Sequence, residues 1–499
     1  MRLPGRFPAA TSLAAGCVMP LAFSPFDLFF IAPLALAWLF LVWLQVPLRR
    51  RVAAAFAFGL GMFGAGVSWV YVSLHDFGNM PPLLAAVCVA GFVALLALYP
   101  AIAALATGLF DRAGNAVRLL VVFPGLWVGA EIARNYLFTG FSWLEIGYSQ
   151  VPSPLGNFGA LAGVHGVSLL TAVSAALVAA LVVGLGARWR PLLLLVVVVA
   201  AGYLLSWIEW TRPAGAPVSA ALVQGNVPLS TKWNFEAANR VARRYLELSR
   251  EADDVDVIIW PESPLPFFID QMGARFYDEV VSLPAPLLSG FLERVPVGER
   301  GFDYHNSAIL FDADTRVYRK RHLVPFGEYT PLPWLFEPLI GYFEVPMSVL
   351  SPWTGPQEPM PVAGRRAAVS ICYEDAFPGD IRPFARDAEF LVNITEDAWF
   401  GDSLAPWQRL QMARMRSIET ARPMLRASNT GLAAAIDHRG RVTALSPMFT
   451  EHVMTAAVQP RTGDTPYLAL GDVPVWMVIV LALGAGLVVA RRHDDGDDA

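Results

Sequence analysis

Hydrophobic residues along this chain form long runs near both ends and only short runs in the middle. Seven long runs, at about 8–25, 28–46, 53–74, 82–109, 119–138, 157–186 and 191–209, precede residue 211, and an eighth covers about 473–490. Their lengths approach the ~20 apolar residues that a helix needs to cross a lipid bilayer. The pattern predicts a transmembrane domain of seven helices over 1–210, a water-soluble domain over 211–472, and a C-terminal transmembrane helix with a short tail over 473–499.

Arginines occupy alternate connections between the predicted spans. They precede the first span and follow the second, fourth, sixth and eighth, at Arg2, Arg6, Arg49, Arg50, Arg51, Arg112, Arg118, Arg188, Arg190, Arg491 and Arg492. The connections at 75–81 and 139–156 contain neither lysine nor arginine. Because cytoplasmic loops carry the excess of positive charge, we expect both termini in the cytoplasm. Residues 211–472 are then expected in the periplasm, on the outer side of a bacterial inner membrane.

Short apolar runs alternate with helical patterns in the middle domain. Runs at 217–226, 255–260, 287–292, 366–372 and 389–394 are typical of strands, and 305–320 is typical of a hairpin. The stretches 235–252 and 404–421 carry apolar residues at helical spacing. This alternation predicts a layered α/β domain and leaves parallel or mixed strand pairing open.

Three of the predicted strands end in a polar residue that is able to take part in catalysis. Glu262 follows "VIIWP", Lys320 ends the hairpin, and Cys372 ends "AAVSI". A carboxylate can take a thiol proton, a thiolate attacks carbonyl carbon, and an ammonium stabilises the oxyanion that forms. Taken singly, each residue is more often structural: a small core cysteine, a turn glutamate and a basic surface lysine. Together they suit acyl transfer or C–N bond hydrolysis.

Composition argues against nucleic-acid binding and in favour of a functional role for Cys372. The chain is 55% hydrophobic with a mean hydropathy of +0.47, and its net charge of -5 gives no reason to expect nucleic-acid binding. Cys17 and Cys88 lie in predicted spans, so Cys372 is the only cysteine of the exported domain. An unpaired thiol in an oxidising compartment points to a functional role.

Several longer motifs resemble those of a known family. They are "VQGNVPLSTKW" at 223–233, "WPESPLP" at 260–266, "YRKRHLVPFGEYTPL" at 318–332, "SICYEDAFP" at 370–378, "DAWFG" at 397–401 and "RPMLRASNTG" at 422–431. These resemble bacterial apolipoprotein N-acyltransferases, whose catalytic domain belongs to the nitrilase, or carbon-nitrogen hydrolase, superfamily. The resemblance implies an αββα sandwich inserted between the seventh and eighth spans.

The resemblance also implies roles for the three strand-end residues. Glu262 would be the general base and acid, Lys320 the stabiliser of the tetrahedral intermediate, and Cys372 the nucleophile. Supporting or substrate-binding positions would be Glu328, Tyr373, Glu374 and Trp233, the last as a lipid contact.

The chain departs from the family pattern at two positions. Glu396 stands where the family commonly has asparagine, and Arg409 stands where histidine is common. We expect neither residue to touch the implied triad. Both could alter how a head group or a loop is held, which weakens any expectation about the preferred donor.

By resemblance, the reaction has two halves and needs no cofactor or metal. Cys372 takes the sn-1 acyl chain of a phospholipid, typically phosphatidylethanolamine, as a thioester. The thioester then acylates the N-terminal amine of the S-diacylglyceryl cysteine of an apolipoprotein, the last step of lipoprotein maturation. The expected partners are these two substrates and the lipid bilayer, and no nucleic acid.

Two other functions are compatible with parts of the sequence. A membrane-anchored amidase of the nitrilase type would use the same triad with water as second substrate, but it would not need seven preceding spans or the apolar stretch at 334–346, which we expect to dip into the lipid interface. A transporter with an exported binding module is the other, and the sequence shows no internal repeat in its favour.

Overall fold

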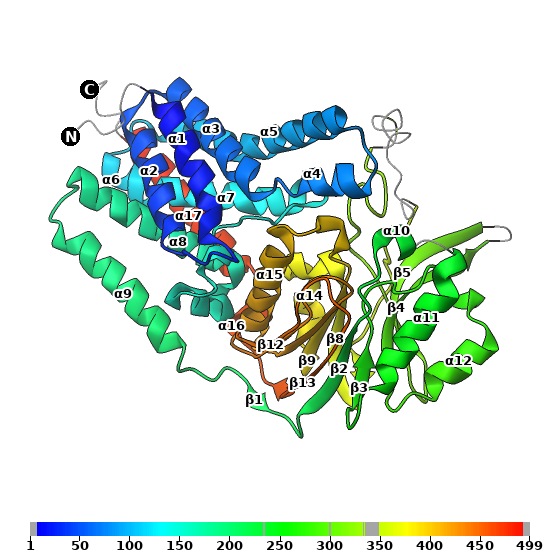
Figure 1. The fold of residues 1–499 in the computed structure, drawn as a ribbon. Coiled ribbons are helices and arrows are strands. Elements are labelled where there is room, and N and C mark those ends of the chain that lie inside the picture. The colour runs from blue at the N-terminus through cyan, green and yellow to red at the C-terminus, as the bar shows by residue number, and fades with distance from the viewer. Residues whose placement is uncertain (1–6, 233–234, 299–300, 333, 335–348, 493–499) are drawn as a thin grey trace. The chain divides into compact units, whose positions relative to one another are not determined.

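The computed structural model describes residues 7–232, 235–298, 301–332, 334 and 349–492, and it divides the chain into two compact units (Figure 1). The helical unit comprises Met1–Tyr71, Leu83–Ile208 and Ala469–Ala499, and the sheet unit comprises Val72–Pro82 and Glu209–Leu468. Trp233 and most of the apolar stretch at 334–346 lie outside the described residues.

A helix occurs at each of the eight predicted apolar runs. These helices are α1 (Pro8–Val18), α2 (Ile31–Gln45), α3 (Leu48–Gly66), α5 (Pro82–Ala106), α7 (Phe123–Tyr136), α8 (Gly159–Val183), α9 (Trp189–Leu205) and α17 (Val473–Arg492). Counting the short helical turns that extend them, four segments among the described residues are long and apolar enough to cross a membrane: Pro82–Phe110, Asn115–Thr139, Pro154–Val183 and Val473–Arg492. Leu48–Gly66 with Val70–Phe77 makes a fifth if this pair, bent by 60°, counts as one span.

The other three apolar helices, α1, α2 and α9, are short. The helix α1 has 11 residues, α2 has 15 and α9 has 17. Even the two longer ones extend only about 22–26 Å, against a hydrocarbon core of about 30 Å. The described residues therefore support a multi-pass membrane protein with four or five candidate spans, and the count of eight stays a prediction.

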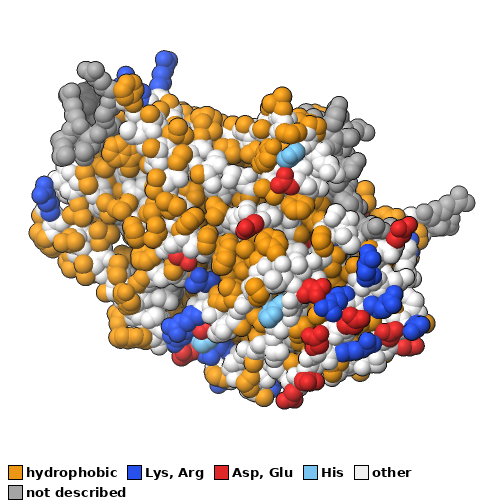
Figure 2. All heavy atoms as spheres, in the orientation of Figure 1, with side chains coloured by type: hydrophobic (Ala, Val, Ile, Leu, Met, Phe, Trp, Pro, Cys, Tyr) orange, Lys and Arg blue, Asp and Glu red, His pale blue; other side chains and the backbone are white. Residues whose placement is uncertain are grey.

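The helical unit carries apolar side chains on its exterior. Leu83 on α5, Val196 on α9 and Leu481 on α17 are more than half exposed, and Figure 2 shows hydrophobic side chains gathered over this unit. Such a surface suits lipid contact rather than water. Close packing holds the helices together: a Cβ on Gly16 of α1 would lie 2.1 Å from the Phe58 carbonyl oxygen of α3, which only glycine permits.

The sheet unit contains two mixed six-stranded sheets. The first has the order β13-β2-β3-β4-β5-β6 and the second the order β12-β11-β10-β9-β8-β7. The first is built from β2 (Val218–Gln224), β3 (Val257–Ile259), β4 (Leu287–Val297), β5 (Gly301–Phe311), β6 (Arg316–Arg319) and β13 (His452–Val458). The second is built from β7 (Met360–Val362), β8 (Arg365–Ile371), β9 (Phe390–Thr395), β10 (Met424–Ser428), β11 (Ala434–Ile436) and β12 (Val442–Leu445).

Each sheet has three parallel strands at its centre and antiparallel strands on both sides. The parallel sets are β2-β3-β4 and β8-β9-β10. Central strands are buried on both faces, so they appear in the sequence as continuous apolar runs; all six residues of β9 are buried. The structure confirms every strand and helix expected in this domain and settles the pairing as mixed.

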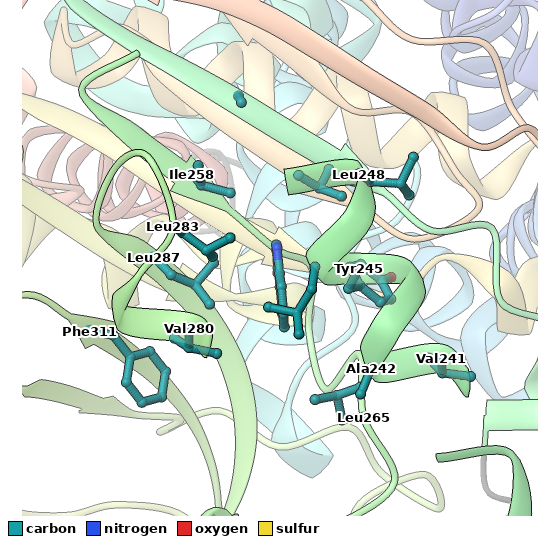
Figure 3. Close-up of a cluster of buried hydrophobic side chains, with 14 of the residues drawn as sticks. Val241, Ala242, Tyr245, Leu248, Ile258, Leu265, Val280, Leu283, Leu287 and Phe311 are labelled. Atoms are coloured by element: carbon teal, nitrogen blue, oxygen red, sulfur yellow. The ribbon is translucent and has the colours of Figure 1, made fainter. Parts of the chain in front are cut away.

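Helices cover the outer faces of the two facing sheets, which gives the expected αββα layers (Figure 1). The helices α11 (Phe235–Arg250) and α12 (Ala274–Val281) pack on the first sheet, and α14 (Pro378–Ala385) and α15 (Ala405–Thr420) lie against the second. Figure 3 shows the core under α11 and α12, where Tyr245 and Leu248 meet Ile258 and Leu287 of the strands. On the solvent side of α11 and α12, charged side chains gather (Figure 2).

One short segment joins the sheet unit although it precedes the main part of that unit by more than a hundred residues. It is Val72–Pro82, which follows the bend after α3. Ser73 donates a hydrogen bond of 2.8 Å to the carbonyl oxygen of Trp399, and the ring of Phe77 packs edge-on against that of Trp399. This segment therefore supports the "DAWFG" turn.

Candidate active site

The three residues singled out at strand ends lie together. Glu262 follows β3 after Pro261, Lys320 follows β6 in the same sheet, and Cys372 follows β8 in the facing sheet. Lys320 Nζ lies 3.2 Å from Glu262 Oε1, and Glu262 and Cys372 are close enough that each shifts the pKa of the other. All three are buried, with exposed fractions of 5%, 1% and 7%. The two sheets thus bring a carboxylate, an amine and a thiol into one enclosed site.

A second carboxylate and an amide complete the surroundings of Lys320. Glu328 Oε1 lies 2.9 Å from Lys320 Nζ, so the ammonium is held between two buried carboxylates. Asn306 of β5 donates from Nδ2 to Glu262 Oε1 at 2.7 Å and to Glu328 Oε1 at 2.8 Å. Opposite charge and hydrogen bonds offset the cost of burying these groups, so the position of Lys320 is fixed.

The charge states follow from these contacts. Burial opposes ionisation of Glu262, but Lys320 and Lys232 outweigh it and hold the pKa of Glu262 below its ordinary value. Burial would lower the pKa of Lys320, yet Glu262 and Glu328 raise that pKa. Burial and the nearby charge of Glu262 raise the pKa of Cys372 to about 11. The resting site therefore pairs an ionised carboxylate and an ammonium with a neutral thiol.

The nucleophile candidate sits in a strained turn. Cys372 has φ 48°, in the left-handed region that residues other than glycine rarely adopt, and it opens a turn over Cys372–Ala376. Glu374 holds this turn: its carboxylate accepts hydrogen bonds from the backbone N–H of Ile371 at 2.7 Å and of Arg321 at 2.7 Å, and from the Tyr318 hydroxyl at 3.0 Å. Glu374 thus ties the turn of Cys372 to the chain just after Lys320.

We expect the Glu374→Gln variant to be less stable. An amide has one oxygen, so the N–H of Ile371 or of Arg321 would face an NH₂ group, and each buried donor without an acceptor costs about 1–3 kcal/mol. In a domain of this size the midpoint of thermal unfolding falls by about 2–4 °C per kcal/mol. Thermal unfolding of the purified protein measures the change, with the exposed Glu358→Gln as control. Equal midpoints in the two variants would contradict this role.

The two remaining supporting positions are Tyr373 and Trp233. Tyr373 is buried in the turn of Cys372, and its ring packs edge-on against Phe377 and His322. Trp233 lies outside the described residues, so its expected lipid contact stays a prediction.

The structure adds groups that the sequence did not single out for the site. Lys232 Nζ lies 2.5 Å from Glu396 Oε2 and 3.1 Å from the Glu262 carbonyl oxygen, and the Glu396 N–H donates to Glu262 Oε2 at 3.0 Å. Arg409 Nη1 lies 3.3 Å from Cys372 Sγ. The expectation that Glu396 and Arg409 do not touch the triad is therefore wrong, because the strand end of Glu396 and the helix of Arg409 both pack against it. A usable signal existed for Asn306, because it is an amide at the start of the strand-like run "NSAILF".

The backbone passes close behind Glu262. A Cβ on Gly290 of β4 would lie 2.5 Å from the backbone nitrogen of Ser263 and 2.8 Å from Glu262 Cα. Only glycine lets β4 approach this closely. The backbone at Glu262 is therefore fixed from behind by the neighbouring strand.

Comparison with known proteins agrees with this arrangement. Residues 15–177 match the model of the apolipoprotein N-acyltransferase N-terminal domain, and residues 219–467 match that of carbon-nitrogen hydrolase. The chain is 40% identical over 488 residues to the apolipoprotein N-acyltransferase of Methylococcus capsulatus, covering 97% of this chain and 96% of that protein. It is 40% identical over 506 residues to the protein of the same name from Nitrosomonas europaea, covering 97% and 98%.

A solved structure, Nit3 of Saccharomyces cerevisiae from the nitrilase superfamily, matches with a TM-score of 0.37 and 18% identity over 51% of this chain and 93% of that one, too weakly to carry an argument. The full-length relatives do carry one, because both family models and both strongly similar proteins cover the helical and the sheet regions in order. The chain therefore belongs to the apolipoprotein N-acyltransferase family of the nitrilase superfamily.

Proposed function

We propose that this protein transfers a fatty acyl chain from a phospholipid to the N-terminal amine of an apolipoprotein's diacylglyceryl cysteine. Relatives that match nearly the whole chain bear the name of this activity. The observation that carries the mechanism is the buried cluster of Glu262, Lys320 and Cys372, in which a 3.2 Å ion pair joins Lys320 to Glu262 and both charges act on the thiol.

The first half-reaction charges the enzyme. Glu262 takes the Sγ proton of Cys372 while the sulfur forms a bond to the ester carbonyl carbon. The negative oxygen of the tetrahedral intermediate is stabilised by the Lys320 ammonium, a contribution worth about 3 kcal/mol or more for a well-placed donor. The carbon–oxygen bond then breaks, Glu262 returns the proton to the leaving lysophospholipid, and a thioester remains on Cys372.

The second half-reaction empties the enzyme. The amine nitrogen of the apolipoprotein attacks the thioester carbon and passes a proton to Glu262, again with Lys320 beside the oxyanion. The carbon–sulfur bond breaks, an amide forms, and the sulfur of Cys372 recovers its proton. Two substrates that use one covalent intermediate in turn give ping-pong kinetics.

Two features favour transfer over hydrolysis. Cys372 is only 7% exposed, so a thioester on its sulfur is shielded from water. The part of the chain that the structure describes also carries four or five candidate spans, whereas a single anchor would be enough to hold an amidase at a membrane. Substrates that both reside in lipid explain a helical unit of this size. A specific acyl position and head group, with sn-1 of phosphatidylethanolamine as our choice, are part of the proposal.

The topology is also part of the proposal. The placement of arginines supports eight spans, cytoplasmic termini and a catalytic domain over 211–472 in the periplasm. With α2 and α9 short of the full hydrocarbon thickness, their flanking arginines would have to extend toward the lipid head groups, as long basic side chains do.

The test offers both substrates to the purified protein. Phosphatidylethanolamine labelled at sn-1 is supplied with a peptide that begins with S-diacylglyceryl cysteine, and products are separated by mass spectrometry. We expect N-acylated peptide together with lysophospholipid in equal amounts. Release of free fatty acid alone, whether or not the peptide is present, would support the amidase or hydrolase and refute transfer.

A further inference from the structure

A buried arginine touches the sulfur of Cys372 from the side of the second sheet's helix. Arg409 lies near the start of α15 and is 0% exposed. Its Nη1 lies 3.3 Å from Cys372 Sγ, and its Nη2 donates to the Cys372 carbonyl oxygen at 2.6 Å. One guanidinium therefore contacts both the side chain and the backbone of the nucleophile.

A charge cluster fixes this guanidinium. Arg409 Nη2 lies 2.7 Å from Asp375 Oδ1, and its Nη1 lies 3.8 Å from Asp397 Oδ1. Arg426 of β10 lies 3.0 Å from Asp397 and 3.9 Å from Asp375. Two cations balance two anions, all of them buried with 0% exposed side chains, so rotation of Arg409 away from the cluster would leave charge uncompensated in the interior.

The cluster does not itself require a contact with sulfur. Two carboxylates already balance the two guanidinium groups, yet Nη1 of Arg409 lies nearer to Cys372 Sγ, at 3.3 Å, than to Asp397 Oδ1, at 3.8 Å. Arg416, two turns further along α15, is also buried, and its guanidinium forms an ion pair of 2.8 Å with Glu419 of the same helix. Arg409 thus differs from a buried structural arginine of its own helix in contacting a reacting atom.

Besides Arg409, the groups that act on the thiol come from three strand ends: Glu262 follows β3, Lys320 follows β6 and Thr395 ends β9. Asp375, in the turn of Cys372 itself, is paired with Arg409. Lys320 is shared between Glu262 and Glu328. Arg409 is therefore the cation directed at the sulfur, while Lys320 is placed beside the carboxylates and the site of the oxyanion.

We propose that Arg409 is a positioning residue that holds the sulfur of Cys372 and stabilises its thiolate form. This rests on the proposed role of Cys372 as nucleophile. Negative charge develops on the sulfur twice in the reaction: when Glu262 removes its proton before attack, and when the carbon–sulfur bond of the thioester breaks. Lys320 then stabilises the negative charge on the carbonyl oxygen, and Arg409 stabilises the negative charge on the sulfur.

Alkylation by iodoacetamide measures this effect without any acyl transfer. The full-length protein carries Cys17→Ala and Cys88→Ala, so that Cys372 is the remaining thiol, and the alkylation rate is followed between about pH 7 and 9.5. In Arg409→Gln we expect the plot of log alkylation rate against pH to shift to higher pH by about 1–3 units, since a nearby opposite charge shifts a pKa by that much. At fixed pH this is a loss of about 10- to 1000-fold.

Two variants serve as controls. Arg416→Gln removes a buried arginine from the same helix and should leave the line in place. Arg409→Lys keeps the positive charge and should lie closer to the unmodified protein than to Arg409→Gln. The proposal is overturned if the pH plot of Arg409→Gln coincides with that of the unmodified protein. It is also overturned if Arg416→Gln shifts the plot as far as Arg409→Gln does.

A loss of folding is treated separately. If thermal unfolding shows that Arg409→Gln is not folded, the double variant Arg409→Gln with Asp375→Asn removes the ion pair as a unit. Its plot of alkylation rate should still shift to higher pH, because Arg409 and not Asp375 contacts the sulfur. A plot that stays in place or shifts to lower pH in the folded double variant would contradict the proposal. A wrong assignment of the nucleophile shows itself elsewhere, as transfer activity that survives Cys372→Ser.

Discussion

Replacement of Cys372 by serine is expected to reduce acyl transfer by at least ~10⁴-fold, because loss of the nucleophile in a catalytic triad costs up to ~10⁶-fold. A hydroxyl holds its proton much more tightly than a thiol, so Glu262 cannot generate the corresponding alkoxide. The substitution changes one buried atom and leaves the turn of Cys372–Ala376 its contacts with Glu374. Transfer from labelled phospholipid to the diacylglyceryl peptide measures the loss.

Two matched variants separate chemistry from folding in this experiment. Cys17→Ser and Cys88→Ser alter the other two cysteines of the chain and should keep full activity. The unfolding midpoint of Cys372→Ser should stay close to that of the unmodified protein. Transfer at more than about a hundredth of the unmodified rate would show that another group carries the acyl chain.

The Glu262→Gln variant is expected to lose about 10²- to 10⁴-fold in the rate of transfer, the usual contribution of a general acid–base group. The side chain keeps its shape and size but can neither take the Sγ proton nor return it. Because Cys372 is a neutral thiol with a pKa of about 11, it depends on this base at neutral pH. Both half-reactions should slow, so neither the thioester nor the N-acyl product accumulates at the usual rate.

Single-turnover measurement of thioester formation and of its discharge tests this second prediction. The exposed Glu358→Gln is the control for the change of glutamate to glutamine and should be fully active. If Glu262→Gln slowed only one of the two steps, Glu262 would not be the shared base and acid. If it slowed neither, the ion pair with Lys320 would be purely structural.

The sequence was sufficient to single out the three residues that the structure brings together, for a physical reason. Buried strands appear as apolar runs, and Glu262, Lys320 and Cys372 each stand at the point where such a run ends. Strand ends meet at a sheet edge, and two facing sheets bring two edges together. Assigning catalytic roles to these three residues needed the family motifs as well, because each residue taken alone is more often structural.

The surroundings of the triad could not be predicted in the same way. The helix at 404–421 is confirmed, but 14 of the 16 residues of α15 are buried, so hydrophobic periodicity does not identify the face that meets Cys372. Arg409 and Arg416 look equivalent in the sequence, yet one contacts the sulfur and the other pairs with Glu419. Such contacts depend on the rotation of a helix and on strands distant in sequence.

In the membrane region the sequence predicts where helices lie but not where they end. Apolar composition correctly placed helices at all eight runs, but composition does not fix where a helix ends. Pro47 precedes α3, and α2 ends at Gln45, so two predicted spans are separated by a tight connection and one of them has only 15 residues. Span length is set by such breaks, which short sequence signals place only approximately.

One measurement addresses the central claim most directly. The purified protein is incubated with labelled phospholipid in the absence of acceptor and is then digested and mapped by mass spectrometry. We predict one acyl group per chain, on Cys372, which disappears when the diacylglyceryl peptide is added and reappears on the amine of that peptide. An acyl group on any other residue, or transfer without a covalent intermediate, would contradict the account.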